Sequence, residues 1–107
     1  MTGTFDQILR LIEDGDVRIS DHGYDELAAD GLFARDVLAT VSEGIVVEEY
    51  PDYPKGPCLL LLQRDAQGRP IHTVWGIPRG KTSPAVLVTA YRPDPEKWSR
   101  DFLRRRR

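Results

Sequence analysis

The pattern of apolar and polar positions changes character part-way along the chain. Before Gly44, apolar residues recur three and four positions apart, as in the run from Phe5 to Ile12, and this is the spacing of one helical face. After Gly44, apolar residues occur in short consecutive or alternating runs bounded by turn residues, a pattern typical of strands. The sequence therefore predicts helices first and strands afterwards, which is an α+β layout.

The first predicted helix spans Phe5 to Asp14. Thr4 is the expected N-cap, and Gln7 stands three residues later, as in a capping box. Gly15 follows the last periodic position and is the expected residue beyond the C-terminus of this helix. Val17–Ile19 is then expected to be a brief extended link.

Two further amphipathic helices are predicted before the strands begin. One starts at Ser20 or Asp21, either of which can cap it, and ends at Gly31, while the next stops at Gly44. Each helix needs a surface to cover with its apolar face. The residues expected on these two faces are Tyr24, Leu27, Ala28, Ala34, Val37, Leu38 and Val41.

Four strands follow one another without helices between them, which predicts a four-stranded antiparallel sheet with the helices gathered on one side. Proline- and glycine-rich segments separate the strands, because proline cannot continue a ladder and both residues favour turns. The predicted strands are Ile45–Tyr50, Cys58–Gln63, Ile71–Ile77 and Ala85–Tyr91.

The core is expected under the helices, on the inner strands. The run Leu59–Leu62 implies a strand that is buried on both faces, or one whose second face meets a partner. The residues expected to be nearly fully buried are Leu60, Leu62, Val74, Val86 and Val88.

A short C-terminal helix over Glu96–Leu103 is predicted, because Trp98 and Phe102 stand four residues apart. Arg104–Arg107 is expected to be a solvated, mobile tail. Residues 1–103 are thus expected to form a single domain.

Composition agrees with a small globular domain. The chain has 107 residues, of which 40% are hydrophobic and 30% charged. No apolar run approaches the roughly 20 residues of a membrane-spanning helix, and the N-terminus lacks the pattern of a signal peptide, so a cytoplasmic protein is expected. Cys58 has no second cysteine to pair with, and one cysteine with two histidines is a poor zinc set, so neither a disulfide nor a metal site is expected.

The charge is unevenly distributed between the two halves of the chain. Residues 1–50 hold three arginines against twelve acidic residues, a net charge of −9, whereas residues 51–107 hold twelve cations against five acids, a net charge of +7. This asymmetry indicates a basic face offered to an acidic partner such as nucleic acid. Equally, the two halves can neutralise each other across the fold.

The chain has no phosphate-binding glycine loop, no nucleophile elbow and no metal-ligand spacing, so the histidines are the main candidates for catalysis. His22 stands at a predicted helix start, where the positive helix end favours the neutral imidazole of a general base. Its structural alternative is capping or packing at that helix start. His72 is either a solvent-facing acid or base near Arg79, Lys81 or Tyr91, or an inert strand residue.

Several cations occupy predicted strand ends and loops. With nearby aromatic residues they can form a surface for single-stranded nucleic acid, or they can be ordinary solubilising charges at turns. Within Arg79–Ser83, one glycine and two cations can approach a phosphate. The cations are Arg64, Arg69, Arg79, Lys81 and Arg92, and the aromatic residues are Tyr53, Trp75 and Tyr91.

Several segments occur in a recognisable order along the chain: Ile19–His22, Asp36–Leu38, Ile45–Tyr50, Pro57–Leu60, Gly68–Val74 and Val88–Pro93, followed by Trp98. With these segments in this order the chain resembles the bacterial DUF4258 family, which looks related to the RelE and ParE superfamily of toxins. The chain departs from that family in carrying Asp25, Glu26 and Asp30 where the family is usually basic.

The resemblance implies a RelE-like fold and the toxin of a toxin–antitoxin pair, because similar proteins are often encoded with a small zinc-finger antitoxin. The expected partner is therefore a small antitoxin of the zinc-finger or DNA-binding type. Such a protein would cut RNA without a metal ion or other cofactor. His22 or His72 would activate the 2′-hydroxyl, Tyr91 would orient the reacting groups or donate a proton, and phosphate would bind to Arg79, Lys81 and Arg92. The competing hypothesis is a non-enzymatic protein-interaction module.

Overall fold

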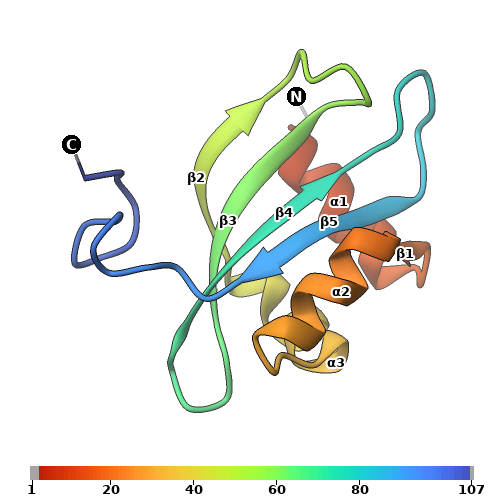
Figure 1. Cartoon of the computed structure of the whole chain (residues 1–107). Coiled ribbons are helices and arrows are strands. Elements are labelled where there is room, and N and C mark those ends of the chain that lie inside the picture. The colour runs from red at the N-terminus through yellow and green to blue at the C-terminus, as the bar shows by residue number, and fades with distance from the viewer. Residues whose placement is uncertain (1–2, 107) are drawn as a thin grey trace.

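The computed structural model describes residues 3–106; Arg107, the last residue of the predicted tail, lies outside them, as do Met1 and Thr2. The described residues contain three α-helices before the four predicted strands, with one short strand between the first two helices, so the α+β class is confirmed (Figure 1). The helices are α1 (Thr4–Glu13), α2 (Asp21–Ala29), α3 (Ala34–Thr40) and the 3-10 helix η1 (Val41–Glu43). The strands are β1 (Val17–Ile19), β2 (Ile45–Tyr50), β3 (Cys58–Arg64), β4 (Pro70–Gly76) and β5 (Ala85–Tyr91).

The sheet within residues 3–106 has five strands in the order β1-β5-β4-β3-β2. Strands β2 to β5 form the predicted antiparallel meander, but β1 pairs parallel to β5, with Val17 opposite Ala85 and Ile19 opposite Leu87. The prediction of a four-stranded, purely antiparallel sheet is therefore wrong. The segment expected to be a link is an edge strand, and three residues are too few to show the alternation that identifies a strand.

The helices do not all lie together on one face, contrary to the prediction. Helix α1 packs against β3, β4 and β5, and α3 against β3, whereas α2 runs along β5 beyond the end of β1. The Ser20 N–H donates to the Leu87 carbonyl O at 3.1 Å, and a Cβ on Gly23 would lie 2.8 Å from that same oxygen. Glycine at position 23 therefore allows α2 to approach the edge of β5.

The apolar face predicted for α2 is confirmed for Leu27 but wrong for Tyr24 and Ala28, because α2 meets the edge of β5. Gly23 and Leu27 are buried against β5, while Ala28 is exposed and Tyr24 is 57% exposed. The cap at Ser20 is confirmed, because its Oγ accepts a hydrogen bond from the Gly23 N–H at 2.9 Å. None of the helices in the described part of the chain is long and apolar enough to cross a membrane.

The ends of α1 agree only partly with the prediction. The N-cap is Gly3 rather than Thr4, and no side chain among the described residues caps this end, so the capping box is wrong. At the other end Gly15 has a φ of 77°, the left-handed conformation that glycine adopts most easily. The predicted end of the helix is thus confirmed.

The core lies between α1, α3 and the face of the sheet that carries Leu59, Leu61 and Trp75, and Leu27 of α2 joins it from the edge at β5. The predicted core set belongs to the other face, and within it Val74, Val86 and Val88 are only half-buried. Leu60 and Leu62 are nevertheless buried, so β3 is buried on both faces, as its apolar run predicted. Both faces of β3 and β5 carry apolar residues, so alternation could not assign the face that meets the helices.

The C-terminal segment, residues 93–106, contains no helix, and the predicted helix over Glu96–Leu103 is wrong. The chain turns back on itself instead, with the Ser99 N–H donating to the Arg104 carbonyl O at 2.8 Å. Asp101 accepts hydrogen bonds from the Ser99 hydroxyl and the Leu103 N–H, and Phe102 has a φ of 61°. These local bonds compete with a helix. The segment lies on the side of the sheet away from α1 and α3 (Figure 1).

Candidate functional site

A hollow lies on the sheet face opposite α1 and α3, and we call it the groove. Its volume is about 400 Å³, a size typical of ligand sites. Strands β3, β4 and β5 form its floor, while the start of α2 and the β2–β3 loop form its rim. The lining residues are Ser20, His22, Tyr53, Lys55, Gly56, Cys58, Gly76, Ile77, Pro78, Val86 and Val88.

His22 reaches the rim of the groove because Ser20 starts α2 beside β5. The Ser20 N–H and Oγ donate hydrogen bonds to the carbonyls of Leu87 and Val88, so the first turn of α2 is fixed to the sheet. The His22 side chain is 64% exposed, and its Nε2 lies 3.7 Å from Oε1 of Glu26. The imidazole is therefore open to a ligand and has a carboxylate beside it, which suits a proton acceptor.

The β2–β3 loop forms the opposite rim and is held firmly against the end of β4. Gly56 has a φ of 131°, and a Cβ there would lie 2.0 Å from the Ile77 carbonyl O. The Arg79 N–H donates to the Lys55 carbonyl O at 2.9 Å, and the Arg79 guanidinium reaches the Pro54 carbonyl O at 3.5 Å. This loop presents Tyr53 and Lys55, both exposed, to the groove.

His72 lies in a second cluster, which the C-terminal segment covers. The imidazole is fully buried, and its Nε2–H donates to the Phe102 carbonyl O at 2.8 Å. Its ring makes edge contacts with Tyr91, at 5.6 Å between centroids, and with Trp98, at 4.4 Å. Burial is the main cause that lowers the pKa of His72, and burial also raises the pKa of Tyr91. Both groups are thus kept neutral, and His72 is closed to a substrate in this conformation.

An ion pair fastens the C-terminal segment over this cluster. The Arg105 guanidinium donates to both carboxylate oxygens of Glu48, at 2.9 and 3.3 Å, and lies 4.7 Å above the Trp98 ring. The Tyr50 hydroxyl also donates to Glu48. The hydrogen bond from Arg105, followed by that from Tyr50, lowers the pKa of Glu48. Arg105 belongs to the expected solvated tail, and no sequence signal paired it with Glu48, which lies 57 residues away.

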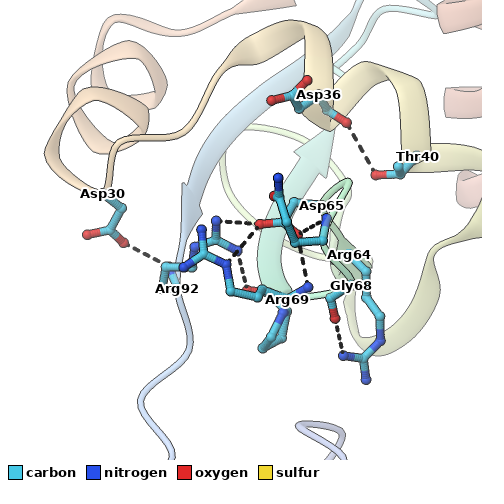
Figure 2. Close-up of polar contacts among 10 residues, drawn as sticks. Asp30, Asp36, Thr40, Arg64, Asp65, Gly68, Arg69 and Arg92 are labelled. Atoms are coloured by element: carbon cyan, nitrogen blue, oxygen red, sulfur yellow. Dashed lines mark hydrogen bonds and ion pairs between the residues drawn. The ribbon is translucent and has the colours of Figure 1, made fainter.

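Arg92 lies at a third place, the end of the β3–β4 hairpin (Figure 2). Its guanidinium donates to Oδ2 of Asp65 at 2.7 Å and to the Pro70 carbonyl O at 3.1 Å, and its backbone N–H donates to Oδ2 of Asp30 at 2.8 Å. The backbone N–H of Arg69 and the Arg92 side chain help lower the pKa of Asp65 to about 2. The Arg92 guanidinium is therefore occupied within the fold.

The predicted site residues thus separate into distinct places. His22 lines the groove, and Arg79 lies beside it on the far side of Tyr53. His72 and Tyr91 form the covered cluster, and His72 is four residues along β4 from Gly76 in the groove, roughly 13 Å at the rise of a strand. Lys81 is exposed in the β4–β5 loop.

Two further residues were misjudged or missed by the sequence analysis. Trp75, expected on an aromatic surface, is fully buried in the core and donates to Gln63, so that expectation is wrong. Lys55 was not singled out, because a lone lysine in a proline-rich loop carries no signal until the loop is placed beside His22. The proline and glycine residues around Lys55 indicated only that it lies in a loop.

Few direct ion pairs join the two unevenly charged halves of the chain. Among ion pairs within residues 3–106, Arg105–Glu48 alone joins a cation of the second half to an acid of the first. Direct ion pairs therefore neutralise little of the charge of either half. No group of three His, Cys, Asp or Glu side chains in the described residues could hold a metal ion.

Comparison with known proteins relates the chain to a family. No curated protein and no solved structure matches it. A family model described as a domain of unknown function (DUF4258) matches residues 19–92, which run from the end of β1 to Arg92 and include the groove. The chain therefore belongs to the DUF4258 family.

Proposed function

We propose that this protein is the toxin-like member of a bacterial type II toxin–antitoxin pair, an endoribonuclease that acts on single-stranded RNA in the groove. The observation that carries this proposal is that His22, Tyr53 and Lys55 line the same groove from opposite rims, although they come from two distant segments. A proton acceptor, an aromatic ring and a cation beside an open sheet face suit a single strand of RNA. The resemblance of the sequence to a family that looks related to the RelE toxins supports the same proposal.

The proposed reaction needs only groups that line or flank the groove. The imidazole of His22 takes the proton of a ribose 2′-hydroxyl, and the 2′ oxygen attacks the adjoining phosphorus. The bond from phosphorus to the 5′ oxygen breaks, and that oxygen takes a proton from the Tyr53 hydroxyl or from water. The products are a 2′,3′-cyclic phosphate and a 5′-hydroxyl, while Lys55 and Arg79 stabilise the added charge on phosphorus.

The test is cleavage of a labelled RNA by the wild-type protein and by the variant His22→Asn. Loss of a general base typically lowers the rate by about 10²- to 10⁴-fold. Because His22 is 64% exposed, the thermal midpoint of His22→Asn should stay close to that of the wild type. Asp25→Asn, an exposed change on the same helix, is the matched control and should cleave normally. Full activity in His22→Asn would exclude His22 as the base.

A second function, the protein-interaction module, is favoured by the outer edge of the sheet. Strand β2 is an edge strand of the sheet, and its residues Ile45 and Val46 are 51% and 37% exposed. An edge strand with exposed apolar residues offers unpaired backbone groups to a partner chain. A protein that ignores RNA but forms a stable complex with the product of an adjacent reading frame would support this function. An antitoxin at the same edge would satisfy both hypotheses.

A further inference from the structure

The rim residue Tyr53 stands between two hollows of different chemistry. On one side lies the groove, and on the other a depression of about 340 Å³ that is lined by Arg79 and Asp52 among others. Tyr53 and Gly56 line both hollows and thus form a shared wall. An occupant that bridges the wall meets an apolar surface on one side and a guanidinium on the other.

The floor of the groove is apolar and uncharged. Val86 and Val88 come from β5, and Cys58 comes from β3. Burial raises the pKa of the Cys58 thiol, so the sulfur is a neutral, weakly polar atom on this floor. A floor of this kind accepts a flat apolar or aromatic group and is unsuited to a charged one.

The cations Lys55 and Arg79 stand on two loops at the rim, and contacts between these loops fix their backbone there. The Arg79 N–H holds the Lys55 carbonyl O at 2.9 Å, and Gly56 has no room for a side chain against Ile77. The wall that carries Tyr53 and Lys55 is therefore formed before a ligand arrives. Such preorganisation reduces the entropic cost of binding.

We propose that the groove is a nucleotide subsite, in which one unstacked nucleobase lies on the apolar floor beside Tyr53 and its phosphate meets Lys55 and Arg79. This inference rests on the proposed function and names the part of the RNA that the groove takes. A base has the flat, uncharged face that the floor accepts, and its phosphate has the charge that the rim cations complement. The Asp52 carboxylate in the neighbouring depression repels phosphate, which places the phosphate on the wall rather than deep in that depression.

The experiment titrates the whole protein with adenosine 3′-monophosphate, adenosine and inorganic phosphate, and follows backbone amide signals around Tyr53, Cys58 and Gly76 by nuclear magnetic resonance. Val88→Phe fills the floor, and its matched control is Val46→Phe on the β2 edge, outside the groove. Lys55→Gln removes the rim cation, and its matched control is Lys97→Gln in the C-terminal segment. Val86→Leu provides a smaller filling change should Val88→Phe fail to fold.

We expect the nucleotide to bind more tightly than adenosine or phosphate alone. Val88→Phe should weaken nucleotide and adenosine binding by about tenfold, a loss typical of one stacked base, and leave the response to phosphate unchanged. Lys55→Gln should weaken nucleotide and phosphate binding but not adenosine binding. The subsite is overturned if the nucleotide binds no more tightly than phosphate. It is also overturned if Val88→Phe and Val86→Leu bind the nucleotide as tightly as the wild type does.

The two proposals fail in different ways. If the nucleotide binds as expected but the wild type leaves RNA intact, the ribonuclease function is wrong and the subsite stands. If RNA is cleaved and Val88→Phe cleaves it with an unchanged kcat/KM, the subsite is wrong and the function stands.

Discussion

The Nε2–H of His72 donates a hydrogen bond to the carbonyl oxygen of Phe102, 2.8 Å away and 30 residues later in the chain. A carbonyl can only accept, so this contact places the proton of the neutral imidazole on Nε2. The other ring nitrogen, Nδ1, is buried and has no partner among the described residues. Protonation would put a charge and an unsatisfied N–H into that pocket, near the Arg105 guanidinium.

Stability should therefore fall in mild acid. The pKa of His72 is lowered from 6.5, chiefly by burial, so below about pH 6.5 the unfolded chain binds a proton that the folded chain does not. The free energy of unfolding should decrease as the pH falls from 6.5 to the folded-state pKa, and this contribution should change no further below it. Urea unfolding at several pH values, followed by tryptophan fluorescence, measures the slope.

His72→Gln is the control for that experiment. Its side-chain amide keeps a donor for the Phe102 carbonyl but does not titrate, so the mild-acid slope should flatten. His22 is unchanged in the variant, so any effect it has on the slope is the same in both proteins. An equal slope in the wild type and the variant would show that His72 does not cause it.

Asp65 should control a separate, more acidic transition. Its pKa is lowered from 3.8 to about 2, so its contribution to stability is complete above pH 3.8 and is lost as the pH falls towards 2. Asp65→Asn should lower the thermal midpoint at neutral pH, because Arg92 and the turn amides lose their charged acceptor. The difference from the wild type should shrink near pH 2. Asp25→Asn, exposed on α2, should leave the midpoint unchanged.

Gln63 should tolerate no apolar replacement, although it lies in the core. Its amide nitrogen donates to the Val37 carbonyl at 2.8 Å, and its oxygen accepts from the Thr73 hydroxyl at 2.6 Å and the Trp75 indole at 3.2 Å. Gln63→Leu leaves these buried groups without a partner, at a cost of about 1–3 kcal/mol for each. Chemical unfolding measures the loss, and Gln67→Leu in the exposed β3–β4 turn should change stability by less than about 0.5 kcal/mol. An equal effect of the two changes would refute the role of this network.

The local parts of the fold could be read from the sequence. Gly15 and Gly31 mark helix ends because their backbone is left-handed, and Ser20 caps α2 with its own hydroxyl. The four strands of the meander begin and end close to their predicted bounds, because prolines and glycines separate apolar runs. These features depend on neighbours in the chain, which the sequence shows directly.

The parts that failed depend on contacts between distant segments. Strand β1 is a strand only because β5 lies beside it, and Trp98 leaves the expected helix to cover His72. The groove likewise requires that the loop with Lys55 meet the start of α2 across the sheet, and no spacing between residues 22 and 55 encodes that meeting. The candidate site could therefore be predicted only as single residues, of which His22, Tyr53 and Arg79 lie at or beside the groove.

The last prediction concerns the salt dependence of RNA binding. Each phosphate contact that a cation makes with a single strand contributes about −0.7 to the slope of log affinity against log salt, because counterions are released. If Lys55 and Arg79 each hold a phosphate, Lys55→Gln and Arg79→Gln should weaken binding and flatten the slope by about 0.7 each. Lys81 is exposed in the β4–β5 loop, two residues after Arg79. It should add to the slope only if the bound RNA extends beyond Arg79.

Fluorescence anisotropy with a labelled single-stranded RNA at several salt concentrations gives both quantities. Glu13→Gln and Asp14→Asn, on and beside the end of α1, lie outside the groove and each change the net charge by as much as Arg79→Gln but with the opposite sign. They should leave affinity and slope unchanged if the basic strand ends form the working surface. If Glu13→Gln or Asp14→Asn strengthens binding as much as Arg79→Gln weakens it, RNA binding depends only on the net charge of the protein. The groove is then not the RNA-binding site. Should the wild type fail to bind RNA even at low salt, the nucleic-acid hypothesis falls and the exposed edge of β2 becomes the better guide to function.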